Sequence, residues 1–120
     1  TIKGYVVKFD SLGNVLWLKD YYVLEEVVKL GYMCSTDSSL YFSGTIWNPS
    51  GTNQIATKLT EIDSSGTLVW DTTFSAYSEQ TFGLRSTSDN GIIISLSKDQ
   101  SSVKAQTIVK KMDANHIVKW

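Results

Sequence analysis

Short apolar segments separated by polar turns run through the whole chain and predict β-strands. The segments are rich in Val, Ile, Tyr, Phe and Thr, and Asp, Asn, Gly and Ser stand at their ends. β-Branched and aromatic side chains favour a pleated strand over a helix. The one stretch with helical character, residues 22–30, is interpreted as a connection that runs into a strand. The predicted strands are residues 2–9, 15–22, 27–35, 40–47, 54–62, 67–74, 80–87, 91–97, 107–112 and 117–120.

Two sequence blocks recur along the chain and indicate an internal repeat. The ten-residue segments that begin at Lys8, Glu61 and Lys111 each have Asp at the third position and Trp at the last. A second block, residues 36–43, is similar to residues 88–95. Two blocks that return in the same order at the same interval predict a structural unit of about 50 residues, a length typical of β-propeller blades rather than of helical repeats.

The repeated acidic residues and glycines are interpreted as turn builders. An Asp at the start of a turn accepts hydrogen bonds from backbone amides, and Gly adopts a positive φ without steric cost. In the third copy His116 stands at the Gly position; because the preceding Asn tolerates the left-handed region, we expect this turn to shift by one residue. The predicted turn-forming residues are Asp10, Gly13, Asp37, Asp63, Gly66, Asp89, Gly91, Asp113 and Asn115.

These motifs resemble the β-propeller repeats of large secreted and cell-surface proteins. The resemblance is carried by Tyr5, Asp10, Gly13 and Trp17 in their spacing, followed by the segment Ser88–Ile94, and it extends over essentially the whole chain. The turn is also similar to those of quinoprotein-type (PQQ-like) blades and of sialidase-type Asp boxes, with an Asp–Gly spacing that differs by one residue from each. The resemblance implies an all-β fold of consecutive four-stranded antiparallel blades. It also implies a docking role between neighbouring blades for Trp17, Trp70 and Trp120.

On this resemblance the chain spans about two and a half blades of a partial propeller. Residues 1–22 are predicted to be the C-terminal half of a preceding blade, residues 23–75 a complete blade, and residues 76–120 a following blade truncated at its last strand. A propeller typically closes with four to eight blades. We therefore expect the chain to be part of a longer polypeptide whose other blades are its partners, or to pair its open edges with other protein chains.

Composition excludes several classes of function. The chain has 120 residues, with 11 basic and 12 acidic side chains and a formal net charge of −1, so it lacks the clustered cations of a nucleic-acid surface. No apolar run is long enough for a membrane span. One Cys and one His can form neither an internal disulfide nor a four-ligand zinc site. The Ser- and Thr-rich composition and the resemblance together suggest an extracellular or cell-surface location.

No motif of nucleophilic, phosphate-binding or dinucleotide-binding chemistry occurs in the chain. Cys34 lies in an apolar, β-rich context and is interpreted as a small buried hydrophobe; His116 is expected to be exposed to solvent in its turn. The oxygen-rich loops at Asp10 and Asp63 leave Ca²⁺ open as an alternative to a pure turn role. No catalytic residue, cofactor or metal ligand is otherwise predicted.

Two residues that depart from the repeat are candidate partner contacts. Trp47 precedes a predicted loop, where an exposed aromatic side chain would suit a ligand or a partner; covering a strand end is the alternative. Arg85 falls in the strand expected to be innermost in its blade, so it could line a central channel or remain a surface residue. The sequence thus predicts a non-enzymatic structural or protein-interaction module of a larger assembly. A carbohydrate- or ligand-binding propeller, or part of a propeller hydrolase or quinoprotein-like enzyme with its active site in other blades, remains the alternative.

Overall fold

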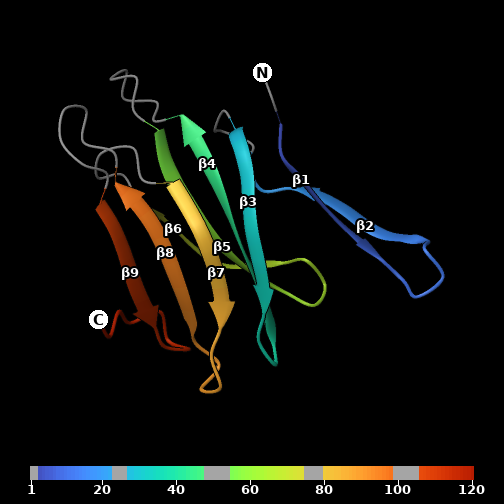
Figure 1. Ribbon diagram of the computed structural model, residues 1–120. Coiled ribbons are helices and arrows are strands. Elements are labelled where there is room, and N and C mark those ends of the chain that lie inside the picture. Colours follow the sequence, from blue (N-terminus) through green and yellow to red (C-terminus); the bar gives the residue numbers. More distant parts are fainter. Residues whose placement is uncertain (1–2, 23–26, 48–54, 75–79, 99–105) are drawn as a thin grey trace.

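The computed structural model describes residues 3–22, 27–47, 55–74, 80–98 and 106–120, and their regular structure is antiparallel β-sheet. The strands are β1 (Tyr5–Phe9), β2 (Val15–Asp20), β3 (Val27–Ser35), β4 (Ser39–Trp47), β5 (Ile55–Asp63), β6 (Leu68–Phe74), β7 (Gln80–Ser86), β8 (Ile92–Lys98) and β9 (Gln106–Met112). They form a two-stranded, a four-stranded and a three-stranded sheet, each in chain order (Figure 1). The predicted all-β antiparallel fold is therefore confirmed. Nowhere in the described ranges is there a helix with the length and hydropathy needed to cross a bilayer.

The β3–β6 sheet lies between the other two sheets (Figure 1). One of its faces packs against the β1–β2 sheet around Phe42 and Ile62, and the other packs against the β7–β9 sheet around Tyr41 and Leu59. Because both faces are covered, exposure does not alternate along β5, where every residue from 56 to 62 is buried. The middle sheet therefore contributes side chains to two separate hydrophobic clusters.

The two outer sheets are covered on one face, and exposure alternates along their strands with the period of two expected for a half-buried strand. In β8, Ile92, Ile94 and Leu96 are buried against the middle sheet, while the residues between them are partly exposed. In β1, Val6 is buried between the exposed Tyr5 and Val7. Each outer sheet thus presents one covered and one open face.

The predicted last strand, residues 117–120, is not formed as a strand. Val118 makes an isolated antiparallel bridge to Met112, and the amide of Lys119 donates to the carbonyl of Lys111 at 2.8 Å. The connection predicted at residues 22–30 enters β3 at Val27, and residues 23–26 lie outside the described part of the chain. The propeller arrangement and its division into blades stay predictions, and none of the three sheets formed by the described strands is closed.

Candidate functional site

Two seams between stacked sheets contain several of the residues that the sequence singles out. We call the contact between the β1–β2 and β3–β6 sheets the first seam, and the contact between the β3–β6 and β7–β9 sheets the second seam. The buried core of the first seam consists of Val6, Tyr22, Val27, Phe42, Ile46, Ala56 and Ile62. The buried core of the second seam consists of Tyr41, Leu59, Leu84, Ile92, Ile94, Leu96 and Met112.

Three turns with the same hydrogen bonds follow β1, β5 and β9, at residues 10–14, 63–67 and 113–117. In each turn the amide of the fourth residue donates to the carbonyl of the first, at 3.0–3.1 Å. One carboxylate oxygen of the first residue accepts hydrogen bonds from the amides two and four residues later, at 2.8–3.0 Å. We call the first residues of these turns the turn aspartates; they are Asp10, Asp63 and Asp113.

Hydrogen bonding lowers the pKa of all three turn aspartates. The largest causes are side-chain hydrogen bonds, from Asn14 to the first, from Ser65 to the second and from Lys119 to the third, and backbone amides add to them. The carboxylates are therefore held in the ionised form by the backbone amides of their turns and by these neighbouring side chains. Their oxygen atoms accept hydrogen bonds from backbone amides, as expected for an aspartate that forms a turn.

The fourth residue of each turn has a positive φ: 87° at Gly13, 78° at Gly66 and 66° at His116. The expectation that the third turn shifts to use Asn115 is wrong. His116 itself adopts the left-handed conformation, because its ring is fixed by contacts to the middle sheet described below. A non-glycine side chain in this region costs energy that surrounding contacts must offset.

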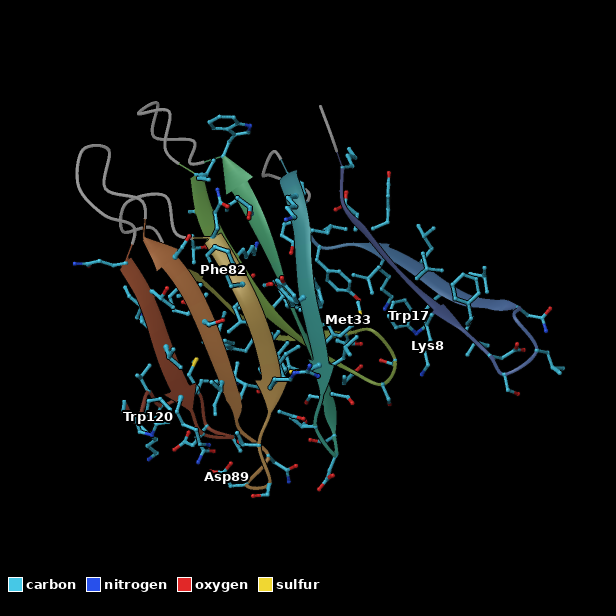
Figure 2. All side chains as sticks on the ribbon, in the orientation of Figure 1. Lys8, Trp17, Met33, Phe82, Asp89 and Trp120 are labelled. Carbon is cyan, nitrogen blue, oxygen red and sulfur yellow. The ribbon has the colours of Figure 1, made fainter. Side chains whose placement is uncertain are left out.

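In the first seam, the indole of Trp17 covers Gly66. A Cβ atom at Gly66 would lie 3.0 Å from two ring carbons of Trp17, so the seam closes tightly on a residue without a side chain. Three donors of the β1–β2 sheet bind carbonyl oxygens of the same turn: Lys8 Nζ at 2.8 Å, Lys19 Nζ at 3.0 Å and the Tyr21 hydroxyl at 2.6 Å. Figure 2 shows Lys8 and Trp17 on the side of this sheet that faces the turn.

In the second seam, the indole of Trp70 covers His116. The two rings are stacked, with centroids 4.1 Å apart and planes inclined by 8°. The imidazole Nε2 also pairs with the buried carboxylate of Glu61 and lies 3.4 Å from the Tyr41 hydroxyl. Burial, and then the adjacent Glu61 carboxylate, raise the pKa of Tyr41. The prediction that His116 is solvent-exposed is wrong, because most of its side chain is buried and only 21% of it remains exposed.

The two seams therefore share one contact, in which the Trp of one sheet covers the fourth turn residue of the next sheet. We call it the tryptophan–turn contact; it joins Trp17 to Gly66 and Trp70 to His116. The polar neighbours that stabilise it were missed from the sequence. Lys8 and Glu61 each stand two residues before a turn aspartate and pair across the strands with the Trp of their sheet. Strand alternation alone would have placed them on the Trp side.

Trp120 makes no tryptophan–turn contact within the described residues. The residue is 63% exposed, and its carbonyl accepts a hydrogen bond from the Lys111 amide at 2.8 Å, which holds it beside β9. In Figure 2 it lies at the edge of the β7–β9 sheet that faces away from the middle sheet. The predicted docking role of Trp120 stays a prediction.

The second repeated block forms turns of two kinds. In the first, the Thr36 amide donates to the carbonyl of Ser39; in the second, one residue longer, the Thr87 amide donates to the carbonyl of Gly91. The Asp89 carboxylate binds Lys111 Nζ at 2.8 Å, and this contact, followed by the Thr87 hydroxyl, lowers the pKa of Asp89. A side chain at Gly91 would collide with backbone of the β9 turn.

Three further candidates are Trp47, Arg85 and Cys34, of which Cys34 packs against the buried core of the second seam. Trp47 ends β4 and is exposed, and the loop predicted after it, residues 48–54, lies outside the described residues. Arg85 is exposed on β7, the strand that lies beside β3 of the middle sheet (Figure 1). Cys34 on β3 is half-buried, and burial raises its pKa, which disfavours a thiolate nucleophile.

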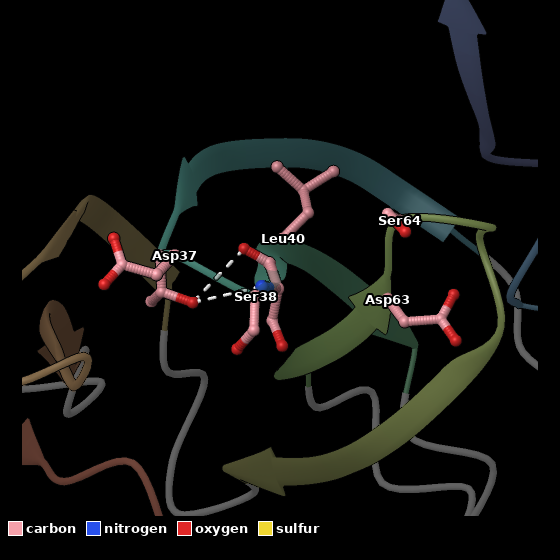
Figure 3. Close-up of a pocket in the computed structure, with 7 residues that line it drawn as sticks. Asp37, Ser38, Leu40, Asp63 and Ser64 are labelled. Atoms are coloured by element: carbon pink, nitrogen blue, oxygen red, sulfur yellow. Dashed lines mark hydrogen bonds between the residues drawn. The ribbon is translucent and has the colours of Figure 1, made fainter.

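Two concave regions adjoin the first seam. A mainly apolar groove of about 440 Å³ lies between Phe9, Trp17 and Met33. A smaller pocket of about 210 Å³ lies between Asp37 and Asp63, whose carboxylates point in opposite directions (Figure 3). Among the described residues, no three His, Cys, Asp or Glu side chains are grouped as a metal site would require. The Ca²⁺ alternative stays a prediction.

No family model matches the sequence, and no curated protein is significantly similar to it.

Proposed function

We propose that the chain is a non-enzymatic structural and protein-interaction module, a run of β-propeller-type blades within a larger stacked assembly. The observation that carries the proposal is the tryptophan–turn contact, which is made in both seams. Trp17 on Gly66 and Trp70 on His116 hold each sheet to the next in the same way. Because the same contact joins the first sheet to the second and the second to the third, it could join further sheets in the same way. In such a stack each sheet is stabilised mainly by its nearest neighbours.

The arrangement of the sheets supports a propeller-type stack. The sheets follow one another in chain order and pack through the two buried clusters. The first strand of the last sheet, β7, lies beside β3, the first strand of the sheet before it. First strands that lie together are expected where blades surround an axis. We further propose an extracellular or cell-surface setting, which the Ser- and Thr-rich composition supports.

The hydrogen bonds of the turn aspartates and of the first seam favour structure over catalysis, and in the second seam the His116–Glu61 pair is covered by the Trp70 indole. The turn aspartates bind backbone amides, and the Lys8, Lys19 and Tyr21 donors bind backbone carbonyls. A general acid–base pair instead needs two titratable groups that face a common cleft. Groups committed to backbone hydrogen bonds stabilise the sheets and are not free to act on a substrate.

Hydrogen exchange on the full chain tests the proposal. Replacement of a fully buried Trp by Ala costs ~3–5 kcal/mol, and Trp70 is only half-buried, so we expect Trp70→Ala to cost ~2 kcal/mol. Exchange should rise in β7–β9 for Trp70→Ala and in β1–β2 for Trp17→Ala, while Trp47→Ala, outside both seams, serves as the matched control. Unchanged exchange in both seam variants, or turnover of general hydrolase or dehydrogenase substrates by the purified chain, would overturn the proposal.

Carbohydrate binding by Trp47 is the second candidate. Its ring is exposed at the end of β4, and an exposed indole offers a flat apolar surface on which a sugar ring can stack. Binding on a glycan array that is lost in Trp47→Ala would support this function. A chain that binds no glycan removes it and leaves the structural role untouched.

A further inference from the structure

Each sheet has two different faces, which the seams use in a fixed order. The face that carries the Trp, here called the tryptophan face, includes Val6 in the first sheet and Leu59 in the second. The opposite face, here called the turn face, carries the last apolar residue before the turn aspartate. In both seams the tryptophan face of the earlier sheet covers the turn face of the later sheet, where Ile62 and Met112 are buried.

One face of each kind is left uncovered within the described residues. On the turn face of the β1–β2 sheet, Phe9 stands at the position of Ile62; Phe9 is 56% exposed and Ile62 is 0% exposed. On the tryptophan face of the β7–β9 sheet, Val109 stands at the position of Leu59; Val109 is 43% exposed and Leu59 is 0% exposed. At these equivalent positions, burial therefore depends on whether a neighbouring sheet covers the face and not on the type of side chain.

The open turn face is apolar and lacks its tryptophan. A Cβ atom at Gly13 would have no other atom within 4 Å, whereas Gly66 at the same turn position lies against Trp17. The exposed apolar side chains on this face and its turn include Tyr5, Val7, Phe9, Leu12, Val15, Leu16 and Leu18. A contiguous exposed apolar surface of this kind marks an interaction site.

The open tryptophan face of the β7–β9 sheet carries a tryptophan that could cover the uncovered Gly13 turn. Trp120 stands in sequence where Trp17 and Trp70 stand, and among the described residues no turn covers this exposed residue. Gly13 offers a turn position without a side chain, as Gly66 does for Trp17. One chain thus carries both partners of a third tryptophan–turn contact, at opposite ends of its stack (Figure 1).

We propose that the tryptophan face of β7–β9 docks on the turn face of β1–β2 of a second copy of this chain, with Trp120 over Gly13. The inference rests on the proposed function, because it extends the internal seams across a chain boundary. A head-to-tail contact of this kind is heterologous, so it closes into a ring or continues as a filament. The association is concentration-dependent and is carried by apolar residues of β1 and β2.

Sedimentation velocity of the full chain over a range of concentrations tests whether copies of the chain associate with one another. The wild-type chain should sediment as multiples of its own mass. Trp120→Ala, which removes the tryptophan half, and Phe9→Asp, which removes the turn half, should each sediment as a monomer. Both residues are exposed, so both variants should retain the wild-type circular dichroism spectrum. Trp47→Ala is the matched indole control and should associate as the wild type does.

Mixing the two variants identifies the geometry. Each variant keeps one intact half, so an equimolar mixture should form dimers and nothing larger. A wild-type chain that stays monomeric, a Trp120→Ala chain that still associates, or a mixture that stays monomeric overturns the head-to-tail partner. None of these results alters hydrogen exchange at the internal seams, so the proposed structural role is judged separately.

Discussion

Replacing Gly66 by Ala tests how tightly the first seam is closed, and Gly13→Ala is the matched control. Both residues have a positive φ, so an L side chain costs about 1–2 kcal/mol at either position. Only at Gly66 would the new Cβ meet neighbours, two ring carbons of Trp17 at 3.0 Å and the Tyr21 hydroxyl at 3.1 Å; at Gly13 nothing lies within 4 Å. Overpacking of this kind costs a further ~1–3 kcal/mol. We therefore expect Gly66→Ala to be the more destabilising change by that second amount.

Urea unfolding, followed by tryptophan fluorescence and circular dichroism, measures the difference. The variants are compared at a concentration at which both sediment as one species, and equal denaturant slopes are required before the free energies of unfolding are compared. Equal losses at the two glycines would refute the reasoning, because backbone strain alone would then account for both. A larger loss at Gly13 would refute the equivalence of the two turns.

Three of the remaining predictions concern stability and one concerns reactivity. Ile62→Ala should cost about 2–5 kcal/mol in urea unfolding, whereas the equivalent Phe9→Ala in the isolated chain should stay within about 1 kcal/mol; similar losses would contradict the assignment of the faces. The pKa of each turn aspartate is below its ordinary value of 3.8, so their stabilisation is complete above that pH and is lost as the pH falls through the folded-state pKa values; a urea midpoint that does not fall below pH 3.8 would argue against it. His116→Ala removes the imidazole that pairs with the buried Glu61 carboxylate, at a cost of about 1–3 kcal/mol, and Glu61→Gln in the same chain should restore part of the thermal stability; no recovery would show that the pair contributes nothing. Because burial raises the pKa of Cys34, a disulfide reagent at neutral pH should modify the folded chain more slowly than the urea-unfolded chain, and equal rates would show that the thiol is open.

Local rules account for the parts of the fold that were predicted well. The bounds of β3 agree with the prediction at both ends, because its apolar run stops at a polar turn. The positive φ at Gly13 and Gly66 follows from the Asp-x-x-Gly spacing, which needs only neighbouring residues to form. Such features depend on a few consecutive residues, so they can be predicted from the local sequence.

The features that were predicted wrongly or missed depend on contacts between residues far apart in the chain. His116 adopts a conformation that glycine usually takes because Trp70 and Glu61 hold its ring, and nothing near His116 in the sequence indicates either contact. The donors Lys19 and Tyr21 bind a turn that lies some 45 residues away. The short pairing of the last residues with β9 was predicted as a strand, since a pattern of apolar residues does not reveal how many of them can pair.

The β1–β2 sheet has a consequence for proteolysis. Two-stranded sheets are marginally stable on their own, and in the described part of the chain this sheet is covered only by the first seam. Opening that seam would free the hairpin as one piece while the other two sheets stay closed around Tyr41 and Leu59. Native-state digestion should therefore first cut the chain between β1 and β2 or just after β2, and leave a shorter, still folded product that contains the remaining seven strands.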